Sequence, residues 1–326
     1  MKKNLLLLLI VLTTTVNAQQ VDYSVVSVNE EAGLEFTQIT TDNDYVCMPE
    51  VKRRGKDLQW WTNRVIDISR SSNDLGYLSF RNNTSNLFVK DLKNKVASKQ
   101  RTNRQFVIDF SFSPDGTKIC FTEKQGQSNR IFITDADKGF VCRQITNNEL
   151  DFTPVYSHDM EQIFFARQEN NKISIWGYNL KDNFVSSYTH GLNPCPLKDN
   201  KVIICSRLSN EGKYEIWKVD YSSGIEECIL SDHNRSFTSP CISPNGEWIL
   251  LVGSSIITTD DFSYANTDIY VCKIDGTQLT QLTYHAADDI SPVWSSDGNY
   301  IYFVSQRGSS KATANVWRIP FLLFNN

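Results

Sequence analysis

The chain has 326 residues, of which 40% are hydrophobic, 12% aromatic and 21% charged, and its formal net charge is −4. This composition is that of an ordinary globular protein, and the mildly acidic balance argues against a nucleic-acid partner, which needs a basic surface. After the N-terminal stretch, no segment approaches the length that a membrane span requires.

Residues 1–18 have the pattern of a secretory signal peptide. Lys2–Lys3 give a positive start, Leu5–Leu12 is an apolar run, and Val16–Ala18 is a small-residue cleavage pattern. The apolar run is too short to cross a bilayer. We therefore expect a cleaved signal peptide and a periplasmic or secreted protein whose single domain is 19–326.

The two ends of the chain are expected to share one structural unit. The last stretch has three apolar runs, Ile290–Trp294, Tyr300–Ser305 and Asn315–Ile319. A fourth run is missing there, but Glu35–Thr40 near the N-terminus matches the fourth run Gln278–Thr283 of the preceding unit. Residues 34–40 are therefore predicted to complete the last unit and close the fold into a ring.

Residues 41–64 fit less well with the units that follow. The stretch Pro49–Arg64 repeats the spacing of Pro292–Arg307, which indicates a hairpin. The next turn, near residue 72, comes too soon for a complete unit between them. The segment is either an extra hairpin on a ring of six or a reduced seventh unit, and we favour six.

One short phrase recurs along the rest of the chain as a polar turn between two apolar runs. It reads Ser113-Pro114-Asp115-Gly116, Ser243-Pro244-Asn245-Gly246 and Ser295-Ser296-Asp297-Gly298. Degenerate copies begin at Ser69, Ser157 and Leu197, and Ser69–Tyr77 lines up without a gap on Ser113–Phe121. The period of about 40–50 residues is typical of propeller blades.

Two further runs follow each turn. The third run carries an aromatic residue, as in Ile131-Phe132, Asp268-Ile269-Tyr270 and Asn315-Val316-Trp317. The fourth run has a Gln-x-Thr pattern, in Gln144-Ile145-Thr146 and Gln281-Leu282-Thr283. The sequence thus predicts an all-β fold, a six-bladed β-propeller of four-stranded antiparallel blades, with seven blades as the alternative.

The Ser-Pro-Asp-Gly turn, the aromatic third run and the Gln-Leu-Thr pattern together resemble the TolB-like β-propeller repeat. The resemblance covers roughly residues 34–320. TolB itself carries a separate α/β domain before its propeller, and residues 19–60 are too short for one. By analogy alone, the resemblance implies that this propeller docks a protein partner or an envelope complex.

Eight cysteines in an exported chain raise the question of disulfides. Four of them, Cys120, Cys205, Cys241 and Cys272, lie in apolar runs, where cysteine behaves as a small buried hydrophobe. One pair, Cys195 and Cys205, faces roughly across the turn at Asp199-Asn200, and a bridge between them stays open. No Cys-x-x-Cys occurs, so neither a zinc knuckle nor a redox pair is predicted.

The chain carries none of the common nucleophile-elbow, phosphate-loop, dinucleotide, zinc-protease or calcium-loop motifs, so no catalytic residue and no cofactor are predicted. Three histidines, His190, His233 and His285, follow fourth runs and are expected on one face. Three imidazoles suit a metal, and propeller lyases that act on acidic sugars resemble this family and use such a site. Otherwise they are polar turn residues. His158 is expected on the opposite face, in no cluster.

A basic set is predicted on the same face as the three histidines. Its members end or follow second runs: Arg64, Arg81, Arg167, Arg207 and Arg307, with Lys124 at the equivalent place. They are candidates for binding an anionic ligand or an acidic partner surface. Alternatively, each pairs with an aspartate of a neighbouring blade or caps strand carbonyls.

Two long loops are expected on this face, Gly253–Thr267 and Gln306–Ala314. Long loops on a rigid scaffold are where binding usually occurs, and Tyr264 in the first is a candidate interface anchor.

Two functions follow from these observations. The first is an exported, non-catalytic propeller that binds a protein partner or envelope complex through its loop-bearing face. The second is a carbohydrate-binding or metal-dependent, lyase-like polysaccharide-processing propeller that uses the histidine and arginine rim.

Overall fold

The computed structural model describes residues 34–48, 53–54, 57–58, 64–94, 96–147, 150–258, 263–308 and 313–321. The predicted signal peptide lies outside the described residues. Strands make up most of the described part, which also contains one 3₁₀ turn, η3 (Asp42–Asp44). No helix in these ranges has the length and apolar character needed to cross a bilayer.

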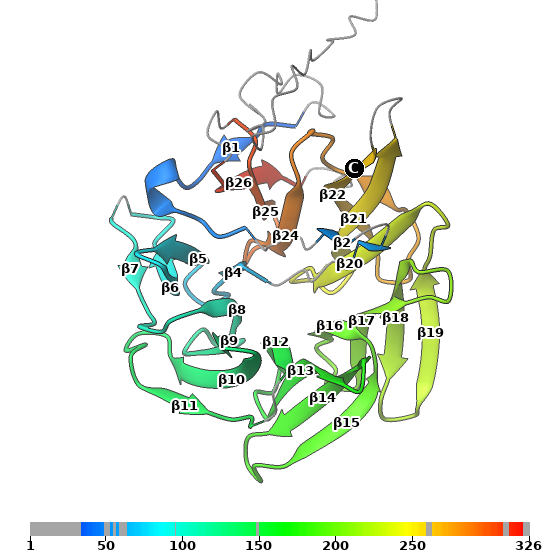
Figure 1. Ribbon diagram of the computed structural model, residues 1–326, viewed down its shortest axis with the longest axis horizontal. Helices are drawn as coiled ribbons and strands as arrows, with labels where there is room; N and C mark the ends of the chain where they lie inside the picture. Colours follow the sequence, from blue (N-terminus) through cyan, green and yellow to red (C-terminus); the bar gives the residue numbers. More distant parts are fainter. Residues whose placement is uncertain are drawn as a thin grey trace, which may run out of the picture.

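Six four-stranded antiparallel sheets stand around a common axis as the blades of a propeller (Figure 1). Blade 1 is β4 (Ile66–Ile68), β5 (Leu75–Arg81), β6 (Thr84–Lys90) and β7 (Lys99–Gln100). Blade 2 is β8 (Val107–Phe112), β9 (Lys118–Gln125), β10 (Ser128–Asp135) and β11 (Cys142–Gln144). Blade 3 is β12 (Asp151–Tyr156), β13 (Gln162–Glu169), β14 (Lys172–Asn179) and β15 (Val185–His190).

The remaining blades follow the same order from the axis outward. Blade 4 is β16 (Leu192–Pro196), β17 (Val202–Leu208), β18 (Tyr214–Asp220) and β19 (Ile225–Leu230). Blade 5 is β20 (Arg235–Ile242), β21 (Trp248–Thr258), β22 (Ser263–Lys273) and β23 (Thr280–Gln281). Blade 6 combines β24 (Asp289–Trp294), β25 (Tyr300–Ser305) and β26 (Asn315–Pro320) with the N-terminal strand β1 (Thr37–Gln38).

Blade 6 closes the ring as the sequence predicts. Thr37 lies opposite Arg318 and Gln38 opposite Trp317, and the Ile39 N–H donates to the Val316 carbonyl at 2.8 Å. The prediction of six blades is confirmed. Within residues 41–64, β2 (Arg53–Arg54) and β3 (Asp57–Leu58) form a two-stranded sheet separate from the six blades.

The fourth-strand pattern is a hydrogen-bond clamp on the third strand. The Thr40 hydroxyl accepts the Val316 N–H at 2.8 Å, and the Gln38 side chain donates to the Thr40 carbonyl at 2.8 Å. Threonines at the same place in other blades accept N–H groups from Leu87, Ile131 and Ile269. Each clamp satisfies a buried backbone donor, which explains why the pattern recurs at the N-terminus.

Two residues determine the shape of the first-hairpin turn: the serine, through its hydrogen bonds, and the fourth residue, through its positive φ. The Ser113 hydroxyl accepts the Lys118 N–H at 2.9 Å and donates to Asp115 at 2.6 Å. The chain then needs a positive φ, which glycine adopts freely and asparagine tolerates. The residues that adopt it are Gly116, Gly246, Gly298, Asn73, Met160 and Asn200. The blade 1 turn has the same length as the blade 2 turn, since the Ser69 N–H donates to the Asp74 carbonyl as the Ser113 N–H does to that of Lys118, but its positive φ falls one residue later, at Asn73.

Two expectations from the sequence are wrong. Cys195 lies opposite Ile204, so Cys205, the next residue, points to the other side of the sheet, and all eight cysteines are free. The stretch Gly253–Thr267 is not a loop, because β21 and β22 pair along it up to Thr258 and Ser263.

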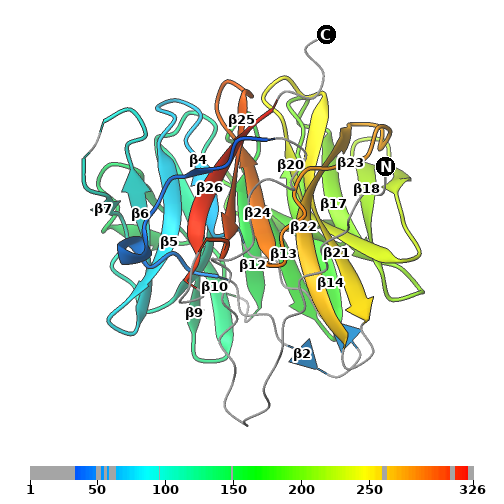
Figure 2. The same cartoon turned by 90° about the horizontal axis from the view of Figure 1, so that it is seen from above.

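The ring has two faces, between which the strands run (Figure 2). The turn face carries the turns that join each innermost strand to its second strand. The connection face carries the links from each outermost strand to the next blade, and also the turns between second and third strands. The core lies between blades, where the largest fully buried side chains are aromatic: Tyr77, Phe110, Phe121, Phe164, Phe165, Phe237 and Phe303.

Candidate binding surfaces

The three predicted histidines lie in three different surroundings. His190 is exposed at the end of β15, with Nδ1 3.3 Å from the Ser174 hydroxyl. His233 is also exposed, and Glu211, 3.1 Å from its Nδ1, raises the pKa of the imidazole. His285 is buried and its Nδ1 accepts the Ala287 N–H at 2.9 Å. Within the described ranges, no three His, Cys, Asp or Glu side chains are grouped so as to hold a metal ion.

Two of the predicted rim arginines are buried in ion pairs. Arg167 forms a two-point contact with Asp151, Nε to Oδ1 at 2.6 Å and Nη2 to Oδ2 at 3.0 Å. Arg307 reaches Asp289 at 2.5 Å from the equivalent place in blade 6. Burial raises the pKa of Asp151, and the Arg167 charge opposes that rise. Each of these two guanidinium groups therefore stabilises its own blade through its ion pair.

Two more rim arginines contact the chain in more exposed positions. Arg207 pairs with Glu226 at 2.8 Å and donates to the His190 carbonyl at 2.9 Å. Arg81 donates to the Asp44 carbonyl at 3.1 Å. Arg64 does not end a second strand: it lies two residues before β4, the innermost strand of blade 1.

The rim arginines also cover the aromatic residues of the third strands. The guanidinium carbon lies 4.5 Å from the ring centre for Arg81 over Phe88 and 4.6 Å for Arg167 over Trp176. Arg207 over Trp217 gives the same 4.6 Å. Such cation–π contacts are attractive and cover the ring face. The predicted basic rim is thus a repeated packing feature of the blades.

A groove of about 420 Å³ opens on the connection face at blade 4. It contains two predicted site residues, Arg207 and His233, and the exposed Leu208 stands beside them. Four of its charged or titratable residues have a partner nearby: Arg207 lies 2.8 Å from Glu226, His233 3.1 Å from Glu211, and Asp232 3.5 Å from Arg235.

A patch of exposed aromatic residues, Tyr45, Phe80 and Phe106, lies on the connection face at blades 1 and 2, and the sequence did not reveal it. The Tyr45 carbonyl accepts the Phe80 N–H at 2.9 Å, Phe80 lies opposite Ser85, and Ser85 bridges to Phe106. The three side chains are 55%, 48% and 36% exposed. The available signal was a phenylalanine at the end of a strand, where a polar residue is usual. We call these three residues the aromatic patch.

Tyr264 lies on β22 opposite Ile257, near the end of the long hairpin of blade 5. Its side chain falls outside the described residues, so its role as an anchor stays a prediction. The second long segment, Gln306–Ala314, joins β25 to β26, and 309–312 within it are outside the described ranges.

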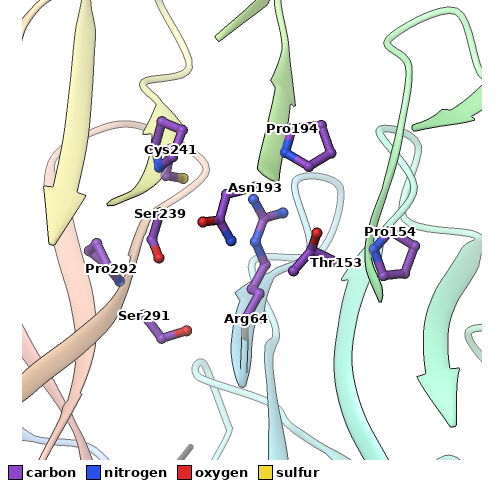
Figure 3. A pocket seen from close by; sticks show the side chains of 10 residues that line it. Arg64, Thr153, Pro154, Asn193, Pro194, Ser239, Cys241, Ser291 and Pro292 are labelled. Atoms are coloured by element: carbon purple, nitrogen blue, oxygen red, sulfur yellow. The ribbon is translucent and has the colours of Figure 1, made fainter. Parts of the chain in front are cut away.

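The axial channel contains one arginine surrounded by polar residues (Figure 3). Arg64 projects among Thr153, Asn193, Ser239 and Ser291, which all have φ near +50° and precede a proline. The space left for water-sized molecules is about 30 Å³. Burial is the largest single influence and disfavours the charged guanidinium, but Asp67 together with three nearby cysteines raises the pKa of Arg64 overall. At this level the channel has room for about one or two waters.

Comparison with protein families decides where this fold belongs. The family model described as the TolB beta propeller domain matches residues 66–255, more than half of the chain. The chain belongs to the TolB β-propeller family. This TolB-family propeller therefore has the family repeat over blades 1 to 4 and part of blade 5.

Individual relatives are distant. An uncharacterized protein of Agrobacterium fabrum is 24% identical over 206 residues, covering 60% of this chain and 64% of that protein, so the chain spans just under two thirds of that relative. A structure described as a TolB from Agrobacterium tumefaciens has a TM-score of 0.62 at 16% identity, covering 80% of this chain and 90% of that one. Oligogalacturonate lyase from Vibrio parahaemolyticus gives 0.54 at 13%, covering 78% and 76%. At such identities, the two structures show the fold alone.

Proposed function

We propose that this TolB-family propeller is an exported, non-catalytic binding protein that docks a protein partner or envelope complex on its connection face. The observation that carries the proposal is the aromatic patch. Exposed aromatic residues on adjacent backbone segments of one face are the usual anchors of protein interfaces.

The patch is held in place before any partner arrives. Tyr45 and Phe80 are joined by a backbone hydrogen bond, and the Arg81 guanidinium carbon lies 5.6 Å from the Tyr45 ring centre. Arg81 is itself fixed by the Asp44 carbonyl. A rigid aromatic surface loses little conformational entropy on binding, which favours affinity.

The turn face offers exposed apolar side chains of a different kind. They stand on the outer loops and strand ends of four blades: Val96, Phe140, Val141, Phe184 and Ile225. Apart from Phe140 and Val141, they are single residues on separate blades, and scattered apolar residues are normal on protein surfaces.

Two further features of the connection face would enlarge the interface. The groove at blade 4 presents Leu208, which is 61% exposed, and Tyr284 is 52% exposed near the start of blade 6. The blade 5 hairpin would add Tyr264. We place the carbohydrate-processing alternative second, because the three histidines have separate surroundings and Arg207 covers the Trp217 ring that a sugar would stack on.

The test compares the two faces. Cross-linking of the tagged wild type in envelope preparations should capture a partner that is identified and then purified. A Tyr45→Ser/Phe80→Ser variant should bind that partner at least tenfold more weakly, about 1.4 kcal/mol or more. The matched control, Phe140→Ser/Val141→Ser on the turn face, should bind like the wild type. Equal binding by all three proteins would reject the proposal.

Export is part of the same proposal. The protein recovered from the periplasm or medium should begin at Gln19, as read by N-terminal sequencing. A mature protein that retains residues 1–18 would contradict the proposal that the protein is exported with cleavage of a signal peptide.

A further inference from the structure

The second position of the first-hairpin turn departs from the family phrase in four of the six blades. It is proline in blades 2 and 5, Pro114 and Pro244, and serine in blade 6. In blades 1, 3 and 4 it is basic: Arg70, His158 and Lys198. Because each turn joins an innermost strand to its neighbour, all six positions lie around the axis on the turn face.

Contacts between turns hold Arg70 close to His158 and tie the His158 turn to the turn that carries Lys198. Nη1 of Arg70 in blade 1 lies 3.5 Å from Nδ1 of His158 in blade 3. The His158 N–H donates to the Asn200 side chain at 3.0 Å, which joins the turns of blades 3 and 4. Lys198, in that blade 4 turn, donates to the Pro244 carbonyl at 2.5 Å. The expectation that His158 belongs to no cluster is therefore wrong.

We propose that Arg70, His158 and Lys198 form a binding site for a free phosphate-type oxyanion on the turn face, at the end of the axis. This site lies on the face opposite the aromatic patch and goes beyond the proposed docking function.

Nothing among the described residues neutralises the two cations directly. Neither Arg70 nor Lys198 forms an ion pair within 4.0 Å there. The nearby carboxylates are engaged with backbone N–H groups. Asp159 accepts from Glu161, Asp199 from Lys201 and Val202, and Asp67 from Ile68 and Phe112.

The protonation state of His158 reflects first its burial and then the two neighbouring cations. Burial, Arg70 and Lys198 together lower the pKa of His158 to about 4, so the imidazole is neutral at pH 7. Its Nδ1 faces the Arg70 guanidinium, which has only donors, so the proton sits on Nε2. The site then offers a guanidinium, an ammonium and an imidazole N–H, a donor set that suits a phosphate oxyanion.

The turns that carry these groups are also preorganised. A Cβ at Gly116 would collide with the Ser69 and Ser71 hydroxyls, so the turns of blades 1 and 2 are in close contact. The Asn73 side chain accepts the Ser296 N–H at 3.2 Å and joins blades 1 and 6. Donors held on a rigid ring need little reordering when an anion binds.

The experiment follows the His158 imidazole by NMR while inorganic phosphate is added at constant ionic strength and pH 7. A His158→Gln variant assigns the signal. We expect a saturable shift of His158 alone among the four histidines. We also expect a rise in the pKa of His158 with phosphate bound, because the anion stabilises the imidazolium.

Matched variants decide whether the site is specific. Arg70→Met and Lys198→Met should each weaken phosphate binding about tenfold. Lys201→Met removes the same charge from an exposed position in the same turn and should leave the affinity unchanged. An unmoved His158 signal, or equal losses in Lys198→Met and Lys201→Met, would overturn the proposal. The Tyr45→Ser/Phe80→Ser variant should bind phosphate normally, so this test and the docking test fail independently.

Discussion

The two faces of this propeller use basic side chains in opposite ways. On the connection face, Arg167 and Arg307 recur at similar points of their blades, and each forms an ion pair with a buried aspartate. On the turn face, Arg70 and Lys198 replace the proline of the repeat, and neither forms an ion pair with a described residue. The difference teaches that side chains which follow the repeat serve the blade, whereas departures from it are free to serve a ligand.

The largest test of this contrast is the buried pair of blade 3. Arg167→Met should lower the free energy of unfolding by about 3–5 kcal/mol, because Asp151 would remain buried without its partner. Arg70→Met on the turn face should change it by less than about 0.5 kcal/mol. Urea unfolding of the three proteins measures both values. Similar losses in the two variants would mean that Arg70 is structural as well.

A second test concerns Asp109, which lies between the faces on the innermost strand of blade 2. Burial raises the pKa of Asp109 to about 6, above its ordinary 3.8. The folded state therefore binds this proton more tightly. The stability that protonation contributes is present below about pH 4 and is lost as the pH rises through 6.

Asp109→Asn removes this titration and keeps an oxygen to accept the Thr153 N–H, which Asp109 accepts at 3.0 Å. Relative to the wild type, the variant should gain about 3 kcal/mol in unfolding free energy between pH 4 and pH 7.5. Parallel unfolding curves over this range provide the measurement. A difference between the two proteins that does not vary with pH would show that Asp109 titrates normally.

The fold was predictable because its signals are local hydrogen-bond motifs. The Ser113 turn and the Gln38-Ile39-Thr40 clamp satisfy backbone groups within a few residues or at a fixed strand position. A clamp pattern without its own blade, at the N-terminus, was enough to place β1 in blade 6. The gapless match of Ser69–Tyr77 to Ser113–Phe121 gave the length of the blade 1 turn correctly, but it did not show that the positive φ would fall on Asn73 rather than on Ser72.

The binding surfaces were less predictable, since they depend on partners that the repeat does not place. The sequence identified the rim arginines but not their partner aspartates, which lie 16 and 18 residues earlier. The cluster at His158 joins blade 3 to blade 1, 88 residues away, so spacing within one unit does not reveal it. The basic residues at the second turn position are visible in the sequence, but they form a pattern only when the turns of all six blades are compared.

A smaller effect is expected at the fourth turn position, where the turn face does follow the repeat. Met160 has a φ of +61°, which is strained for a side chain with a Cβ. Met160→Gly should raise the unfolding free energy by about 0.5–1 kcal/mol, after the entropy of glycine in the unfolded chain is deducted. Asn200→Gly at the same place in blade 4 should instead lose stability, because asparagine tolerates this conformation and its side chain accepts the His158 N–H. Thermal unfolding would contradict this account if Met160→Gly lost stability.

The smallest effect on stability is expected at the second turn position, and it is the most direct test of the contrast between faces. Lys198→Pro restores the residue found in blades 2 and 5, and proline suits the first central position of such a turn. It should change the unfolding free energy by no more than about 0.5 kcal/mol while weakening phosphate binding as Lys198→Met does. His158→Pro is the counterpart: it removes the N–H that donates to Asn200 and should cost about 1 kcal/mol. If Lys198→Pro instead destabilised the protein as much as His158→Pro, the lysine would belong to the scaffold, and the turn face would use its basic residues as the connection face does.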